Sequence, residues 1–303
     1  MRYKNPRPMT EPTDKQLSTG PARDRVIRSM TDDGAFRVMT ISSTQTVRDC
    51  IAAQDVRGLP AAQLGELLTA AVLVRETMAP SLRVQILLRD DQGGLIVGDS
   101  FPEGRTRGLV RVQDEVLGVA TNSKGGSVQV MRSLPGRAPH QGIVSSDQPG
   151  GITDAIGIYF QQSEQVETFV GIGCIVEEDR VVAAGGYVIQ LLPELTDPPL
   201  AAMRKRLEEF GSVDSVLVAH DDAEWLTERL LAGTEFTRLG EDSVEFACGC
   251  GPEKAIRALA VLGKEEIEEM LADGKPIRVT CDYCREVFEA GPDEFRRILD
   301  ADA

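Results

Sequence analysis

Four of the six cysteines form two close pairs near the C-terminal end of the chain. The pairs, Cys248-Gly249-Cys250 and Cys281-Asp282-Tyr283-Cys284, are separated by 30 residues. Two thiol pairs on two turns, joined by a short folded segment, are typical of a four-cysteine zinc site. Sulfur ligands favour Zn²⁺, and four of them leave no open coordination position, so the site should be structural rather than hydrolytic. The predicted zinc ligands are Cys248, Cys250, Cys281 and Cys284.

Two other interpretations of the cysteines remain open. The pairs could be two unrelated thiol pairs, or residues 281–284 could be a thioredoxin-type Cys-x-x-Cys motif. The thioredoxin motif needs a βαβ context, whereas this one follows a short predicted strand, residues 275–280.

The Cys-x-Cys half is unusual, because ordinary zinc ribbons place two or more residues between the cysteines. One intervening residue holds the two sulfurs close together, so the neighbours can oxidise to each other once the metal leaves. We expect Gly249 to permit the tight bend. A ring this small should be strained and easily reduced again, which suits a switch.

The block that carries the cysteines, residues 248–303, is too small for a strong hydrophobic core. Helices are predicted to start at Pro252 and Lys264 and over residues 293–303. Below about 70 residues a domain generally needs a covalent or metal cross-link. Zinc binding, worth about 10–16 kcal/mol in small zinc peptides, would supply the stability, so this block should unfold without its metal.

The rest of the chain divides into three predicted parts. Residues 1–20 are polar without an apolar core, which predicts a disordered tail rather than a signal peptide. Residues 21–194 predict an α+β core domain. It should begin with a helical stretch at residue 22, followed by a strand over residues 35–41 and a helix ending near residue 54. A long central helix should follow over residues 60–78, then several alternating strands and a helix over residues 152–165.

Residues 195–247 predict an acidic helical linker. Prolines mark its start, and the segment has 12 acidic and 5 basic side chains. Apolar residues recur at helical spacing, and a second helix should begin at Asp221 or Asp222 and end at Gly233. The segment is too poor in apolar residues to fold alone, so we expect it to pack on its neighbours, including the zinc block.

Charge and composition exclude several function classes. Forty-eight acidic against 33 basic residues give a net charge of −15, which disfavours binding to phosphate backbones or anionic membranes. No stretch reaches the length of a spanning helix. We therefore expect a cytoplasmic protein, in a reducing compartment where cysteines rarely form static disulfides. His140 and His220, the only histidines, should be surface residues. Cys50 and Cys174 should be buried, unreactive thiols.

The chain resembles the heat shock protein 33 family, the redox-regulated 33 kDa chaperonins. The resemblance rests on the two cysteine pairs and their spacing, and on Arg107-Gly108 and the segments at residues 64–65, 159–165 and 184–193. It implies one Zn²⁺ on the four cysteines in the reduced state. On oxidation it implies disulfides between Cys248 and Cys250 and between Cys281 and Cys284, with zinc release. It further implies unfolding of the zinc domain and linker, and an ATP-independent holdase that binds unfolding clients during oxidative stress and often forms a homodimer.

In this family Gly or Asn commonly follows the last cysteine, where this chain has Arg285.

Three functions are compatible with these sequence features. A redox-controlled holdase is not an enzyme and needs no nucleotide, and the chain has no phosphate-binding G-x-x-x-x-G-K-[ST] motif. A constitutive zinc-ribbon adaptor is the alternative. The net charge of −5 over residues 246–303 disfavours nucleic acid as its partner but allows a protein. A thiol oxidoreductase using Cys281 and Cys284 is the third. Zinc content before and after peroxide treatment separates the three.

Overall fold

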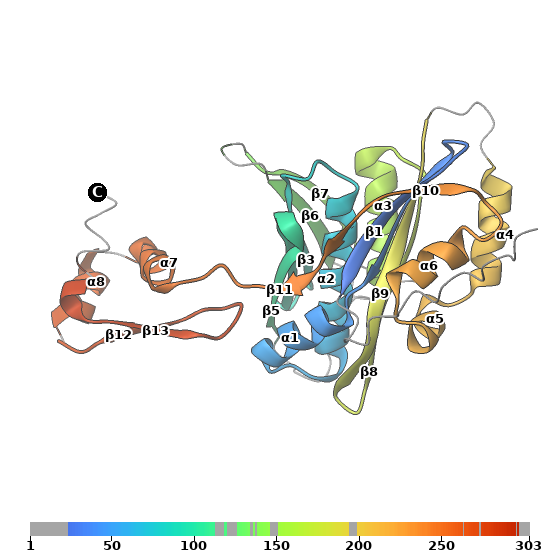
Figure 1. Cartoon of the computed structure of the whole chain (residues 1–303). Helices are drawn as coiled ribbons and strands as arrows, with labels where there is room; N and C mark the ends of the chain where they lie inside the picture. The colour runs from blue at the N-terminus through green and yellow to red at the C-terminus, as the bar shows by residue number, and fades with distance from the viewer. Residues whose placement is uncertain are drawn as a thin grey trace, which may run out of the picture.

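The computed structural model describes residues 24–112, 118–119, 126–133, 136, 138–145, 151–193, 199–262, 264–272, 274–294 and 296. It shows a mixed α/β body with two sheets and a small C-terminal block that extends to one side (Figure 1). The predicted tail, residues 1–20, lies outside the described residues, as does most of the helix predicted over residues 293–303. The expected fold class, a mixed helix and strand protein with a C-terminal group of four close cysteines, is confirmed.

The first sheet has five antiparallel strands. In hydrogen-bonding order they are β10 (Phe236–Ser243), β1 (Arg25–Thr31), β2 (Phe36–Ser42), β9 (Arg180–Leu191) and β8 (Thr168–Glu177). The helical stretch predicted from residue 22 is wrong, because β1 is a strand from Arg25. This strand pairs on both sides, with β2 and with β10 more than 200 residues away. Such distant pairing overrides a local helical preference.

The second sheet has six strands. In order they are β11 (Glu245–Phe246), β5 (Arg105–Arg111), β4 (Leu95–Ser100), β3 (Arg83–Arg89), β6 (Ser127–Ser133) and β7 (His140–Ser145). All neighbours are antiparallel except β11, which runs parallel to β5. The short 3-10 turn η1 (Pro102–Gly104) joins β4 to β5. The alternating strands predicted in this region are confirmed.

Helix α2 (Gly58–Glu76) passes between the two sheets and is buried on nearly every side. It contacts β3, β4 and β5 of one sheet and β8 and β9 of the other. The backbones approach closely at Gly98 of β4, where a Cβ would lie 2.5 Å from the carbonyl oxygen of Leu67. The prediction of a central helix covered on most faces is therefore confirmed.

Two more helical segments complete the body. Helix α1 (Thr44–Gln54) begins after Ser43, whose hydroxyl pairs with Thr69 rather than capping the helix. Helix α3 (Gly151–Tyr159) continues into the π-helical segment η2 (Phe160–Glu164). Both helices were predicted close to these bounds.

The segment predicted as a helical linker contains helices and then strands. Its helices are α4 (Leu200–Phe210), α5 (Val213–Ala219) and α6 (Ala223–Leu230). Asp222 caps α6 by accepting hydrogen bonds from two backbone amides. The helical prediction is wrong for Phe236–Phe246, where β10 extends the first sheet and β11 the second.

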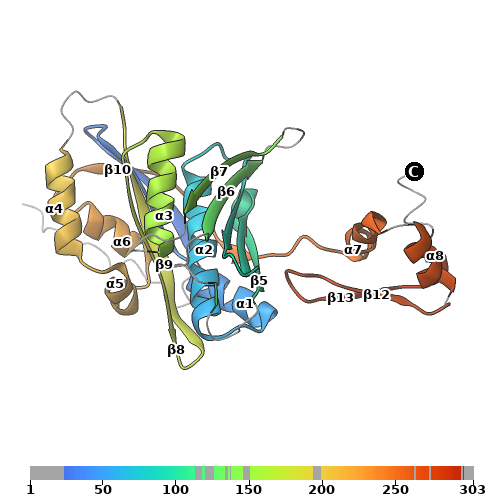
Figure 2. The same ribbon diagram turned by 180° about the vertical axis from the view of Figure 1, so that it is seen from behind.

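Helices α4–α6 cover the outer face of the five-stranded sheet. Their apolar side chains join a buried cluster with strand residues that include Phe36, Val38 and Ile189. They lie on the opposite side of the body from the C-terminal block (Figures 1 and 2). The expectation that the linker helices rest on that block is therefore wrong; β10 and β11 make the connection instead.

In its described part the C-terminal block shows two α-helices, a 3-10 turn and a two-stranded hairpin. Its elements are α7 (Pro252–Arg257), the 3-10 turn η3 (Ala258–Val261), α8 (Lys264–Ala272), β12 (Ile277–Thr280) and β13 (Val287–Ala290). Among the side chains that the structure describes in this block, the buried apolar cluster is small: Ile256, Ile277 and Ala290, with a few half-buried neighbours. Among the described residues, no helix is both long enough and apolar enough to cross a membrane.

Candidate metal centre

The first cysteine pair follows β11 directly. Glu245 and Phe246 pair with Arg105 and Thr106 of β5, and the Ala247 amide donates to the Thr106 carbonyl at 2.8 Å. This places Cys248 beside the second sheet. The expectation that the bend requires Gly249 is wrong, because its φ is not positive and an added Cβ would lie 3.8 Å from the nearest atom, Lys254 Nζ.

The second pair lies in the turn between β12 and β13. The Cys281 amide donates to the Glu286 carbonyl, and the Arg285 amide donates to the Cys281 carbonyl, both at 2.9 Å. Arg285 has a φ of 61°, in the left-handed region that costs most residues free energy but suits glycine. These bonds hold Cys281 and Cys284 on one side of a tight turn.

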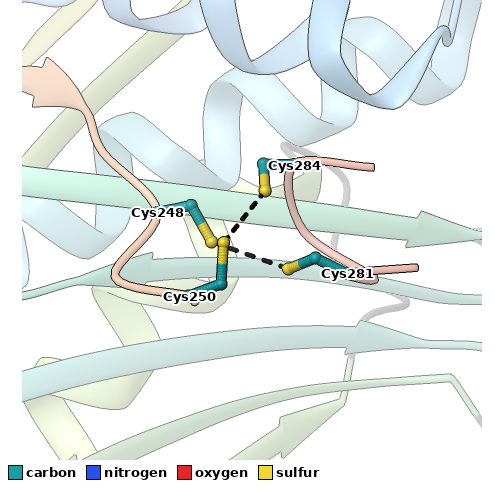
Figure 3. A group of neighbouring side chains, drawn as sticks. All are labelled: Cys248, Cys250, Cys281 and Cys284. Atoms are coloured by element: carbon teal, nitrogen blue, oxygen red, sulfur yellow. Dashed lines mark hydrogen bonds between the residues drawn. The ribbon is translucent and has the colours of Figure 1, made fainter. Parts of the chain in front are cut away.

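The two pairs face each other, and all four Sγ atoms lie within 4.8 Å of one another (Figure 3). The Sγ atoms of Cys248 and Cys281 are 3.7 Å apart, and those of Cys250 and Cys284 are 3.3 Å apart. Tetrahedral zinc with bonds of ~2.3 Å requires sulfurs ~3.8 Å apart. Four half-buried thiols at this spacing fit a tetrahedral metal ion of the zinc type. The site can therefore hold a metal through the four predicted cysteines.

Packing four thiols together changes their acidity. Burial and then hydrogen bonds with the neighbouring thiols raise the pKa of Cys250. Burial also raises the pKa of Cys284. At Cys281 burial acts in the same direction, but backbone amides of Cys284 and Tyr283 outweigh it and lower the pKa. A bound cation would compensate the mutual repulsion of four thiolates, which is what a metal at this place would contribute.

The metal-binding turn is attached to the body through Gln54, the last residue of α1. Its Nε2 donates to the carbonyl oxygens of Asp282 and Tyr283, at 2.8 and 2.6 Å. Its Oε1 accepts from the amide of Val110 in β5, at 3.0 Å. This buried carboxamide therefore links helix, sheet and turn.

Arg107 of β5 contacts one residue from each of the two cysteine segments, Cys248 and Tyr283. Its guanidinium lies 3.9 Å from the centre of the Tyr283 ring, and one nitrogen is 3.9 Å from the Cys248 sulfur. Arg107 and Arg83 both pair with Asp99, which is fully buried. Arg111 forms an ion pair with Asp282. The metal centre thus lies against a polar rim of the second sheet.

The remaining sequence candidates behave as predicted. Cys50 and Cys174 are buried, and burial raises the pKa of each, that of Cys50 to about 12. His140 and His220 are exposed, although His140 begins a strand and His220 stacks on Trp225.

Sequence reasoning did not single out Gln54, Arg107 or Tyr283 as contacts of the site. In the sequence, Gln54 is an ordinary polar residue at the end of a helix. Its contact with the metal-binding turn involves a residue 228 positions further along the chain. An aromatic residue inside a metal-binding turn was a signal for Tyr283, because such a turn leaves little room to bury the ring within its own block.

Comparisons with known proteins agree on one family. The family described as Hsp33 protein matches residues 24–290. The 33 kDa chaperonin of Halalkalibacterium halodurans is 28% identical over 291 residues, covering 91% of this chain and 99% of the relative. That of Lactococcus lactis subsp. lactis is 26% identical over 288 residues, with the same coverage. The crystal structure of the 33 kDa chaperonin from Thermotoga maritima superposes with a TM-score of 0.76 at 23% identity, covering 93% of this chain and 99% of that one.

Proposed function

The chain belongs to the Hsp33 family, and from this premise we propose that it is a redox-regulated, ATP-independent holdase. In this proposal Cys248, Cys250, Cys281 and Cys284 hold one Zn²⁺ in the reduced, inactive protein. Oxidation releases the metal and lets the protein bind unfolding clients.

The observation that carries the proposal is the position of the four cysteines. They join the chain leaving the second sheet to the hairpin of a block whose described side chains form only a small buried cluster. A metal there would hold the block together, and its free energy of binding would be folding free energy. Losing even one ligand removes the main cross-link of the block.

The redox step involves only the four sulfurs and an oxidant such as peroxide. Each disulfide forms from two thiolates, which give two electrons to one peroxide; with two protons, that peroxide becomes two waters. Two such reactions give Cys248–Cys250 and Cys281–Cys284 disulfides and leave no thiolate ligand. Zinc-bound thiolates are the reactive form of cysteine, and the site is half-exposed, so an oxidant can reach it.

Opening of the centre reaches the linker through β11 and β10. Strand β11 has only two residues paired to β5, and its extension at Ala247 leads straight to Cys248. Once the cysteines are released, β11 keeps only its two-residue pairing with β5, the packing of Phe246 and a few hydrogen bonds of Val244 and Glu245, and β10 directly precedes it along the chain. Release of β10 frees α6, whose Leu226 and Leu230 cover the first sheet. Apolar surface on both sides then becomes available to clients.

Further features belong to the same proposal. The protein is cytoplasmic, is not an enzyme, and binds neither nucleic acid nor membrane; the oxidised form is a homodimer. Its domains are a tail (1–20), a core domain (21–194), a linker (195–247) and a zinc-binding switch domain (248–303).

Aggregation suppression tests the proposal. Reduced zinc-loaded protein and peroxide-treated protein are mixed with a thermally unfolding enzyme, and light scattering and released zinc are followed together. We expect suppression only after oxidation, in proportion to zinc release. A retained zinc and equal activity in both states would favour the constitutive adaptor, and a protein without zinc that reduces disulfide substrates would favour the oxidoreductase.

A further inference from the structure

An apolar patch lies on the outer face of the second sheet, on the side away from α2. Leu87, Val97 and Leu109 lie side by side on adjacent strands β3, β4 and β5. Half-buried Leu95 and Met131 extend the patch. The alternate residues of these strands, such as Ile86 and Ile96, belong to the core around α2. We refer to Leu87, Leu95, Val97, Leu109 and Met131 as the outer patch.

Tyr283 of the metal-binding turn covers the outer patch. Its ring packs against the cluster, and its hydroxyl is 3.4 Å from Gln85 Nε2. With this cover in place Leu87, Val97 and Leu109 are only 7, 3 and 7% exposed. Tyr283 lies between Cys281 and Cys284, so release of the two cysteines removes one of the restraints that keep the cover in place, beside the hydrogen bonds of Gln54.

The rim of the outer patch is positively charged. Arg83 and Arg107 share a single carboxylate, Asp99. Arg111 pairs with Asp282, which leaves together with the turn. Removing the turn therefore exposes apolar surface beside three arginines and one aspartate, in a chain whose net charge is −15.

The turn also shows what the outer patch can bind. The bound groups are an aromatic ring, a neighbouring carboxylate and two backbone carbonyls, which Gln54 holds. Two consecutive carbonyls point the same way only where the backbone turns, as it does here, so the Gln54 contacts select a turn-like backbone and no particular side chain. The aromatic ring and the carboxylate add selectivity through stacking on Arg107 and pairing with Arg111.

We propose that the outer patch is a client-binding surface for turn-forming segments with an aromatic residue next to an acidic one, and that Asp282-Tyr283 occupies it as an internal mimic until oxidation. This inference rests on the proposed holdase function and assigns it a site on the second sheet, separate from the surface under α4–α6.

A peptide derived from the turn is the direct probe. It spans residues 279–287 with serine in place of Cys281 and Cys284, carries a fluorophore, and is titrated with full-length protein. We expect binding to the oxidised protein at least about tenfold tighter than to the reduced zinc-loaded protein. A matched peptide with Tyr283→Ser should bind about tenfold more weakly, because a central aromatic anchor typically dominates such contacts.

Variants on each side of the contact make the test specific. Leu109→Gln should weaken peptide and client binding by the oxidised protein, whereas Leu239→Gln, an exposed residue on β10 of the other sheet, should not. Thermal melting of both variants checks the fold. If Leu109→Gln does not fold, Tyr283→Ala provides the second test. In its reduced, zinc-loaded state this variant should bind a peptide with an aromatic residue next to an acidic one, whereas the reduced, zinc-loaded wild type should not.

The outcomes separate this inference from the holdase proposal. If oxidised protein suppresses aggregation but does not bind the peptide, the proposed binding role of the outer patch is wrong, while the proposed holdase function is still supported. A folded Leu109→Gln variant with wild-type binding would also overturn it. Peptide binding by oxidised protein that cannot suppress aggregation would support the outer patch and reject the holdase function.

Discussion

The side-chain amide of Gln54 donates a hydrogen bond to the backbone carbonyl of Tyr283 at 2.6 Å, across the junction between the body and the metal-binding turn. Gln54 is 5% exposed, and its oxygen is already engaged with the Val110 amide. A buried carboxamide with its hydrogen bonds made on both sides holds the turn to the sheet more firmly than exposed ion pairs do.

We expect Gln54→Ala to loosen the metal-binding turn. The change removes three hydrogen bonds and leaves the Val110 amide buried without a partner, which costs about 1–3 kcal/mol. Zinc should be lost faster to a chelator, and activation should need less oxidant. A zinc-release time course measures the first effect and a peroxide titration of holdase activity the second.

Gln63 is the matched control. It is also buried, and its carboxamide bridges both backbone groups of Val119 without touching the metal block. Gln63→Ala should lower the melting temperature similarly and leave the zinc-release rate unchanged. Equal release rates in the two variants would show that Gln54 has only a general structural role.

Arg285 is expected to limit the stability of the metal site. Its φ of 61° costs a residue with a side chain roughly 1 kcal/mol relative to glycine. Its side chain is exposed. Arg285→Gly should therefore strengthen zinc binding by up to about fivefold, measured by competition with a chromogenic chelator, whereas Arg285→Ala should bring no such gain. Weaker zinc binding in the glycine variant would indicate that the guanidinium itself supports the turn.

The sequence predicted the parts of the fold that rest on local patterns. The alternating strands after the central helix, the all-round apolar character of α2 and the Asp222 cap are local signals, and each is present in the structure. The cysteine pairs were equally clear, because metal ligands need fixed residue types at fixed spacing.

The errors arose where distant segments meet. The strand character of Arg25–Thr31 and Phe236–Ser243 depends on pairing between the two ends of the chain, which no local window reports. The contacts of Gln54 and Arg107 with the metal-binding turn have the same origin. Predicting them needs the topology first, since only the parallel addition of β11 to β5 brings the cysteines to this edge.

A fragment of residues 24–193 tests the proposed core domain. It retains α2 and most of both sheets, so we expect it to melt cooperatively. It lacks α4–α6, which exposes Phe36, Val38 and Ile189, and it lacks β10, which leaves β1 as an edge strand. The fragment should therefore bind unfolding clients without oxidant and self-associate above micromolar concentrations. Light scattering with an unfolding client measures client binding, and sedimentation measures self-association. A non-cooperative thermal melt of the fragment would place the domain boundary after β10 instead.

We expect packing of the linker to depend on pH through Glu66 of α2. Burial, and then the negative charge of Asp214 on α5, raises the pKa of Glu66 from 4.5 to about 7; burial also raises the pKa of Asp214. Because the folded pKa lies above the unfolded one, the proton is held more tightly in the folded state. Its contribution to stability is complete below the unfolded pKa of 4.5 and is lost as pH rises through about 7.

The wild-type chain should therefore lose stability relative to Glu66→Gln as pH rises from 4.5 to about 7. At about 1.4 kcal/mol per pKa unit the difference reaches at most about 3 kcal/mol, and partial exposure of the side chain reduces it. Denaturant unfolding at several pH values gives the difference, and hydrogen exchange of residues 213–219 shows whether α5 loosens first. Glu228→Gln, an exposed carboxylate on α6, is the control and should follow wild type. Parallel curves for wild type and Glu66→Gln would exclude Glu66 as the titrating group.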